Sequence, residues 1–239
     1  MTQELGPLVI TAASIGFIHT LLGPDHYVPF IMMSWARKWS AAKTAVITVL
    51  CAFGHIGSSV ILGLIGVSFG LAVKGLEGTE SIRGEIAAWL LIAFGLAYLI
   101  WGLRFIYRRH PHQHTHPHLT DGPRGHAHRH THLGEHTHVH DVQSAKAVTP
   151  WVLFIVFVFG PCEPLIPILM YPAARGGLAD LLVVTAVFGA VTTGTMLAAV
   201  FLGKAGVDFL PLKKVQRYSH ALAGGTILLC GLAIRFLGL

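Results

Sequence analysis

Charged side chains are scarce in this sequence: Asp, Glu, Lys and Arg make up 12% of its 239 residues. Soluble domains carry about a quarter, and a charged side chain in hydrocarbon is costly. Hydrophobic residues make up 53% of the chain, and the mean hydropathy is +0.63. The shortage of charge therefore excludes an ordinary soluble domain and predicts a protein surrounded mainly by lipid.

Cysteines and catalytic motifs are scarce as well. Cys51, Cys162 and Cys230 are far apart and each lies in an apolar run, which excludes a disulfide framework. The sequence contains no His-Glu-x-x-His pair. It has no RNA-binding or helix-turn-helix signature, so the net charge of +6 does not indicate nucleic-acid binding. The N-terminus carries Glu4 and no basic segment, so a removable signal peptide is not expected.

Long apolar runs are what the sequence has in abundance. A membrane-spanning helix needs about 20 predominantly apolar residues. Six runs reach that length: residues 7–33, 43–73, 85–107, 149–173, 178–203 and 216–238. Many glycines lie inside them, and small residues let transmembrane helices approach closely. The expected fold class is all-α, a polytopic membrane protein of about six transmembrane helices.

Basic residues between the runs predict the orientation of the chain. The connections after the first, third and fifth runs are rich in Lys and Arg, with Arg37 and Lys38 in the first and Lys213 and Lys214 in the fifth. The connections after the second and fourth runs are mixed in charge. The positive-inside rule places the basic connections in the cytoplasm. We therefore expect a multi-pass protein of the cell (inner) membrane with both termini outside.

A histidine-rich segment separates the third run from the fourth. Twelve of the sixteen histidines lie between positions 110 and 140, where Pro and Gly residues break any regular element. We expect a flexible cytoplasmic loop over residues 110–147, between three-helix halves at residues 1–109 and 148–239. Imidazole is the commonest protein metal ligand, so the loop is predicted to bind metal in an accessory role. Its spaced histidines are His112, His114, His116, His118, His126, His128, His130, His132, His136, His138 and His140.

Each predicted half opens on a similar motif. Residues 23–26 read Gly-Pro-Asp-His and residues 160–163 read Gly-Pro-Cys-Glu, and a further proline follows each motif. Proline lacks a backbone donor and disturbs a helix. Each half has three helices, an odd number, so the second half enters the membrane from the side opposite to the first and the two halves have opposite topology. The matching motifs therefore predict a 3+3 inverted repeat in which the first helix of each half is broken.

Ionisable residues at these motifs predict a metal site. His19 and His26 are seven positions apart, about two helical turns, and Asp25 adjoins the second. Broken helices at membrane depth line cavities or are buried, and ionisable residues there indicate function. Glu163 lies deep in an apolar run, and Cys162 is either a thiolate ligand or a small apolar filler. Imidazole and carboxylate together suit nickel, cobalt or zinc. The alternative is a set of structural histidines bonded between helices.

Other runs add a further candidate ligand and four candidate supporting residues. His55 lies in the second run, and Ser58 and Ser59 follow it by three and four positions. That spacing predicts that the serines orient the imidazole or bind partly hydrated cargo. Thr192 and Thr193 in the fifth run are either their counterparts or bonded back to their own helix.

These residues resemble a known family. Residues 19–26 (HTLLGPDH) are similar to the His-plus-Asp-His signature in the first helix of the NiCoT/NicO nickel–cobalt transporters, of the LysE-like superfamily. Residues 54–59 resemble the second-helix motif, residues 160–163 the fourth-helix motif, and the histidine-rich loop that of the efflux members. Five residues separate the first His from the Asp-His pair, where the nickel–cobalt permeases usually have four. This spacing is closer to the urease-accessory-like and short NicO branches.

The predicted function is transport of a divalent transition-metal ion through a midplane His/Asp/Glu site, with nickel or cobalt as the cargo that the resemblance implies and zinc still open. The sequence does not favour import over export. No enzyme activity, resident cofactor or nucleic-acid partner is expected. Membrane lipid surrounds the chain, and a second copy or a metallochaperone are the protein partners to consider. The alternatives are an intramembrane metalloenzyme, a transporter of another solute of the superfamily, a metal sensor, and a thiol relay, which would need opposed cysteines.

Overall fold

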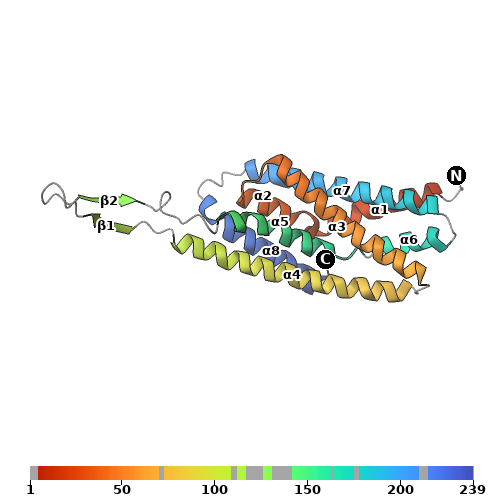
Figure 1. Ribbon diagram of the computed structural model, residues 1–239. Coiled ribbons are helices and arrows are strands. Elements are labelled where there is room, and N and C mark those ends of the chain that lie inside the picture. Colours follow the sequence, from red (N-terminus) through yellow and green to blue (C-terminus); the bar gives the residue numbers. More distant parts are fainter. Residues whose placement is uncertain are drawn as a thin grey trace.

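The computed structural model is a bundle of helices with a two-stranded ribbon beyond one end (Figure 1). It describes residues 5–69, 73–108, 112–116, 126–130, 142–162, 164–174, 178–209 and 215–238. In chain order the elements are α1 (Leu5–Leu22), η1 (Pro24–His26), α2 (Val28–Ala36), α3 (Ala41–Ser68), α4 (Val73–Arg108), β1 (His112–His116), β2 (His126–His130), α5 (Val142–Phe159), α6 (Leu165–Ala174), α7 (Leu178–Phe209), η3 (Gln216–Tyr218) and α8 (Ser219–Leu237).

The helices match the six apolar runs. α1, α3, α4, α7 and α8 contain stretches that are long and apolar enough to cross a membrane, and Thr149–Phe159 of α5 is a shorter apolar helix. The first run is broken between α1 and α2, and the fourth is broken between α5 and α6. The prediction of a helical polytopic membrane fold with breaks in these two runs is confirmed.

The third run is longer than predicted. α4 begins at Val73, not near residue 85, so Glu77, Glu80, Arg83 and Glu85 belong to a helix and not to the second connection. The physical reason is visible in the packing: Glu80 and Arg83 form an ion pair inside the bundle, which lets the helix continue through its charged turns.

The histidine-rich segment contains regular structure, which corrects the expectation that prolines and glycines would prevent it. β1 and β2 pair antiparallel, with His112 opposite His130, His114 opposite His128 and His116 opposite His126. Since alternate residues of a strand share a face, these six positions lie on the same face of the ribbon. α5 also begins at Val142, inside the expected loop. His118, His132, His136, His138 and His140 lie outside the described residues.

The two halves run in opposite directions. In Figure 1, α1 and α2 run from right to left and α5 and α6 from left to right, and α4 and α8 are likewise opposed. The broken helix of each half packs on the second helix of the other half: α1 and α2 on α7, and α5 and α6 on α3. This exchange is what a 3+3 inverted repeat predicts. The ends of α2, α4 and α7 lie at one end of the bundle, so the three basic connections leave it together (Figure 1).

Glycines bring the third helices of the two halves into close contact. A Cβ atom on Gly95 or Gly102 of α4 would lie 2.4 or 2.5 Å from a backbone nitrogen of α8. A Cβ atom on Gly224 or Gly231 of α8 would lie 2.3 or 2.9 Å from an atom of α4. Both pairs are seven residues apart, about two turns. The same spacing in both halves therefore supports the repeat independently of the two motifs.

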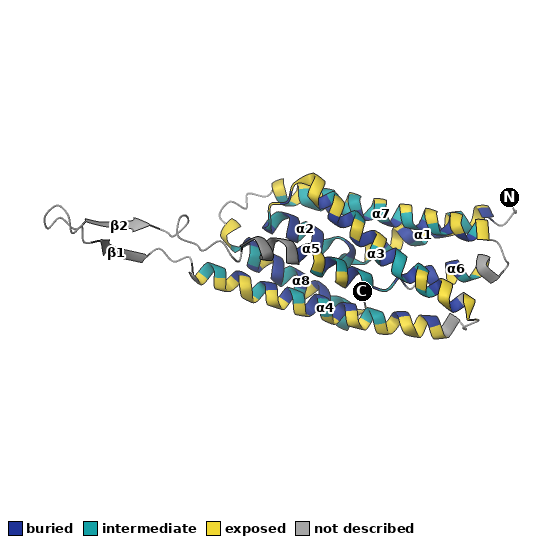
Figure 2. Cartoon of the chain, viewed as in Figure 1, coloured by how far each residue is buried: buried dark blue, intermediate teal, exposed yellow. Residues whose placement is uncertain are grey.

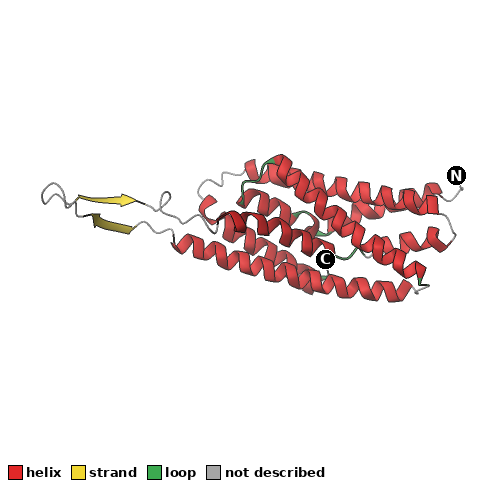
Figure 3. Ribbon diagram, viewed as in Figure 1, coloured by secondary structure: helices red, strands yellow, loops and turns green. Residues whose placement is uncertain are grey.

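The outside of the bundle is apolar, unlike the surface of a soluble protein, while the inside combines apolar clusters with a few polar side chains. Large apolar side chains such as Phe53, Leu202 and Leu229 are at least two-thirds exposed on the outside of the bundle, where Figure 2 shows exposed positions along the helices. Polar side chains, including His26, His55 and Glu80, are buried inside. Among the described residues of the bundle, the non-helical backbone lies at the connections, at the two breaks and at the C-terminal end (Figure 3). The few buried polar side chains are therefore the candidates for chemistry inside the bundle.

Candidate metal site at the two helix breaks

The first break forms where Pro24 interrupts the helical hydrogen bonds. The last turn of α1 closes with a bond from the Gly23 amide to the His19 carbonyl, 3.0 Å long. η1 follows, with a bond from the His26 amide to the Gly23 carbonyl at 3.1 Å, and α2 then begins at Val28. This short turn places the His26 side chain in the interior, where 2% of the residue is exposed.

Hydrogen bonds fix the orientation of the His26 ring. Its Nδ1 atom lies 3.0 Å from the Asp25 Oδ1 atom and 3.1 Å from the Gly23 carbonyl oxygen. Both partners are acceptors when the carboxylate is ionised, so Nδ1 carries the proton and donates. The lone pair is then on Nε2, which is buried without a partner. A carboxylate that orients a histidine in this way is the usual arrangement behind a metal-ligating imidazole.

Three imidazoles converge at this point. The ring centroids of His19 and His26 are 4.8 Å apart, those of His26 and His55 are 5.1 Å apart, and those of His19 and His55 are 6.3 Å apart. His19 comes from α1, His26 from η1 and His55 from α3. The Nε2 atoms of all three rings have no hydrogen-bond partner although they are buried. Buried polar atoms are normally paired, so these ring nitrogens are available to bind a ligand.

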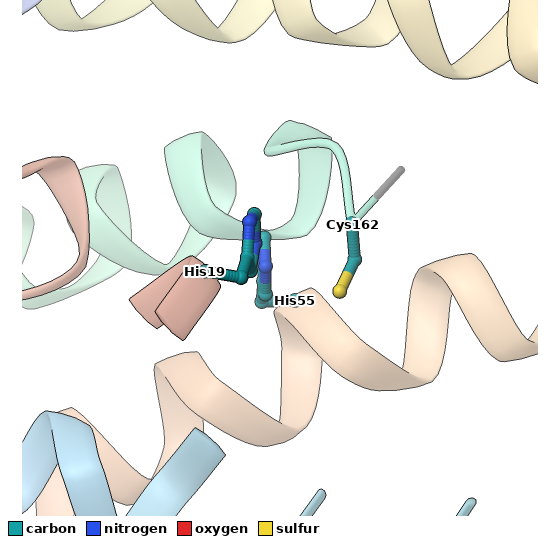
Figure 4. Close-up of side chains that lie close together, drawn as sticks. All are labelled: His19, His55 and Cys162. Atoms are coloured by element: carbon teal, nitrogen blue, oxygen red, sulfur yellow. The ribbon is translucent and has the colours of Figure 1, made fainter. Parts of the chain in front are cut away.

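The second break adds a thiol to the cluster. α5 ends at Phe159, and Gly160, Pro161 and Cys162 follow in non-helical conformation. One ligand atom from each of His19, His55 and Cys162 lies within 4.8 Å of the others, and Figure 4 shows the two rings side by side with the thiol beside them. Two ligands on one tetrahedral zinc-like ion are about 3.3–3.6 Å apart. Small side-chain rotations would therefore bring the three atoms onto one ion.

The cluster opens onto a cavity between the two halves. Its volume is about 860 Å³, and its lining includes His19, Asp25, His26 and His55 on one side and α4 on another. Glu85 and Arg235 also line it, and Arg235 Nη2 lies 3.5 Å from Glu85 Oε1. A hydrated divalent ion fits this volume with room for water. The sequence prediction that both motifs face one interior site is consistent with this geometry.

The candidate supporting residues make the following contacts. Ser58 donates to the backbone carbonyl of His55 at 2.8 Å, and Ser59 donates to Glu80 at 3.4 Å, so neither bonds to the imidazole. Thr192 is buried in α7, with its Oγ1 atom 3.1 Å from where a Cβ on Gly16 of α1 would lie. Thr193 does not line the cavity. Glu163 lies outside the described residues.

Two residues of the site region were missed by sequence reasoning, namely Glu80 and Arg83. Arg83 donates to Ser58, to Ser59 and to the carbonyl of Val158, and Glu80 accepts from the backbone amide of Cys162. These bonds form a network that joins α3, α4 and the second break. The signal in the sequence was an acid and a base three positions apart, a spacing typical of one helix face.

Comparison with known proteins identifies a family. Residues 28–233 match the model of the family described as cytochrome c biogenesis protein transmembrane region. No curated protein and no solved structure matches the chain. The matched range begins after η1, so His19, Asp25 and His26 precede it. The matched family is not that of the nickel–cobalt transporters, so the match does not confirm the resemblance of the motifs to those transporters. It covers most of the chain, which therefore belongs to the membrane protein family of cytochrome c biogenesis protein transmembrane regions.

Proposed function

We propose that the protein transports a divalent transition-metal ion across the membrane, with nickel or cobalt as its leading cargo. The observation that carries this proposal is the buried cluster of His19, His26 and His55, whose Nε2 atoms all lack a partner. The cluster lies where both halves of an inverted repeat are broken, which is the usual place of a transporter's substrate site.

The donor set determines which ions the site favours. Imidazole nitrogen and cysteine sulfur suit nickel, cobalt, zinc and copper, whereas magnesium and calcium prefer oxygen ligands. In the proposed mechanism His19, His26 and His55 bind the ion, and Asp25 orients His26 and contributes negative charge. The cavity lets the ion keep part of its hydration shell. Protons that Asp25, His26 or Glu163 take up as the ion leaves would couple transport to a proton gradient.

The histidine-rich ribbon has an accessory role in this proposal. Its position on the side of the basic connections makes it cytoplasmic under the positive-inside rule. The register of β1 and β2 supports metal capture, because it groups six histidine positions on one face. Such a surface would collect ions for export or hold imported ions.

A second candidate is a part in cytochrome c biogenesis, which the description of the family names. Cys162 favours it, since this buried cysteine lies at a helix break beside two imidazoles. A thiol relay needs a second cysteine opposite the first. In the described part of the chain, however, Cys51 and Cys230 belong to a different apolar cluster from Cys162. This arrangement favours metal over thiol chemistry.

Flux of radiolabelled nickel, cobalt and zinc into vesicles that contain the purified protein tests the proposal. His26→Ala should abolish flux, whereas His220→Ala should leave it unchanged, because His220 lies against Tyr98 and Trp101 away from the cavity. Unchanged flux in His26→Ala would refute the site. Replacing all three cysteines with Ala should preserve some metal flux, whereas a thiol relay would lose its activity completely. Flux that ignores a pH gradient would remove the proton coupling alone.

A further inference from the structure

An ion pair in α4 spans the second helix break. Glu80 is fully buried, and the Arg83 side chain is 15% exposed. The two side chains are bonded to each other one turn apart on the helix. An isolated charge is costly in such an interior, so the pair must be compensated by further hydrogen bonds.

Those bonds go to the backbone of the break. Arg83 Nη2 donates to the carbonyls of Val158 and Gly160, at 2.8 and 3.4 Å, which the end of α5 leaves free. Glu80 Oε2 accepts from the amide of Cys162, at 3.1 Å, just before α6. A cation therefore sits at the C-terminal end of one half-helix and an anion near the N-terminal end of the next. Both charges match the helix dipoles.

The same pair holds the turn that follows His55. Arg83 donates to Ser58 Oγ at 2.6 Å and to Ser59 Oγ at 3.2 Å. Ser58 in turn donates to the His55 carbonyl at 2.8 Å. Glu80 and Arg83 therefore connect His55 on α3 with Cys162 at the break. His55 and Cys162 belong, with His19, to the group of residues whose potential ligand atoms lie within 4.8 Å of one another.

The first break is held differently. Among the described residues, its polar side-chain bonds come from Asp25 and His26 of the break itself, together with Tyr27, which donates to the Leu21 carbonyl at 3.3 Å. No Lys or Arg forms a described ion pair there. Within the described part of the chain, an ion pair from another helix therefore contacts only the break that carries Cys162.

We propose that Glu80 and Arg83 are positioning residues that hold the second break so that the Cys162 thiol becomes a ligand of the transported ion. The inference rests on the proposed function. When a divalent ion M²⁺ binds, the thiol loses its proton and a sulfur–metal bond forms, so one H⁺ leaves for each ion that is bound. His19 and His55 supply nitrogen ligands beside it. The site is then a mixed nitrogen–sulfur site, which favours late transition metals over harder ions.

Cobalt(II) titration of the purified full-length protein tests this assignment, because a cobalt–thiolate bond gives a charge-transfer absorption in the near ultraviolet that nitrogen ligands do not give. The wild type should show this band, and Cys162→Ser should lose it while retaining the visible bands of histidine-bound cobalt. Arg83→Met should weaken the band and lower cobalt affinity about 10–100-fold, as loss of an outer-shell partner typically does. The matched control is Lys204→Met, which removes the base of an exposed ion pair to Asp208.

A charge-free double variant guards against simple misfolding. Arg83→Met leaves Glu80 buried and unpaired, whereas Glu80→Gln with Arg83→Gln keeps donors and acceptors without charge. The double variant should recover the thiolate band that the single variant loses. A folded Arg83→Met protein with an unchanged band and affinity would overturn the positioning role, as would a double variant that folds without the band. Wild-type protein that binds cobalt without a thiolate band would overturn the inference but leave transport intact. Absence of any cobalt binding would overturn both.

Discussion

Gly23 and Gly160 occupy equivalent places in the two motifs, and each leaves room for an imidazole nitrogen. A Cβ atom on Gly23 would lie 2.5 Å from His26 Nδ1, and one on Gly160 would lie 3.0 Å from His55 Nδ1. Contacts below 3.0 Å require something to move, and at Gly23 the neighbours are the ring and carboxylate of the site itself. The glycines of the repeated motif are therefore part of the site's geometry and not only of helix packing.

Gly23→Ala should displace the His26 ring and abolish or strongly reduce metal flux. Gly57→Ala is the matched control, since a Cβ atom at that position of α3 meets nothing within 4 Å. Isothermal titration calorimetry measures the nickel affinity of both variants, and vesicle assays measure their nickel flux. Wild-type affinity in Gly23→Ala would contradict the described position of His26.

In the proposed site, Asp25 acts on the metal through His26, whose Nδ1 atom it contacts. Asp25→Asn retains an acceptor for His26 Nδ1 but removes the negative charge, so nickel affinity should fall by about 10-fold, at the mild end of outer-shell effects. Asp25→Ala removes the acceptor as well and should reduce affinity further. Titration calorimetry of the two variants distinguishes the role of the Asp25 charge from its role as a hydrogen-bond acceptor. Equal losses of nickel affinity in the two variants would mean that the charge alone matters. A complete loss of nickel binding in Asp25→Asn would make the carboxylate a direct ligand.

Sequence reasoning found the candidate ligands but not the polar residues that contact them. His19, Asp25 and His26 could be found because ionisable residues within an apolar run are conspicuous and because their spacing is local. Glu80 and Arg83 could not, because charged residues near the end of a run look like a connection. Their partners Val158, Gly160 and Cys162 are about eighty positions away in the chain. Only the packing of the halves brings them together.

At the scale of elements, α4 and α8 make the most extensive contact among the described helices, and backbone contact leaves no space for a side chain at Gly95, Gly102 or Gly224. Gly224 and Gly225 are adjacent but differ in environment: a Cβ atom on Gly224 would lie 2.3 Å from the Leu99 amide nitrogen, whereas one on Gly225 would lie 4.0 Å from a Leu99 methyl carbon. Rigid backbone on both sides means that the first clash cannot be relieved by rotating a side chain. The packing of the first half of the protein against the second therefore depends on the close contact between α4 and α8.

Gly224→Ala should destabilise the protein by about 1–3 kcal/mol, the usual cost of overpacking. Gly225→Ala should be neutral or slightly stabilising, because Ala is favoured over Gly in a helix by about 1 kcal/mol. Thermal unfolding of the detergent-solubilised variants measures the difference. Similar melting temperatures for both would show that α4 and α8 do not approach as closely as described.

The sequence also anticipated the elements unevenly. Six apolar runs and two proline-containing motifs were enough to predict the broken helices, because hydropathy and proline act locally. The start of α4 was placed about twelve residues too late, since its first turns carry charges that tertiary bonds satisfy. The ribbon of β1 and β2 was not expected, because its pairing joins residues across an intervening segment rich in Pro and Gly.

At the scale of the whole molecule, the two candidate metal-binding features lie in different places. The ligand cluster is inside the bundle between the halves, whereas the ribbon lies beyond its end (Figure 1). The ribbon is also outside the lining of the cavity. A transporter with this layout would move ions through the bundle and use the ribbon only to collect or retain them, whereas a sensor would depend on the ribbon itself.

Replacing the histidines between positions 110 and 140 with Gln separates these two roles without changing the length of the connection. The maximal rate of nickel flux should remain, because His19, His26 and His55 are untouched, but the nickel concentration that gives half of that rate should rise if the ribbon supplies the cytoplasmic entrance. Vesicles sorted by orientation reveal the direction: the shift should appear only when metal is offered on the side of the basic connections. A variant with no flux at all would instead assign the essential metal site to the ribbon, and the internal cluster would then be structural.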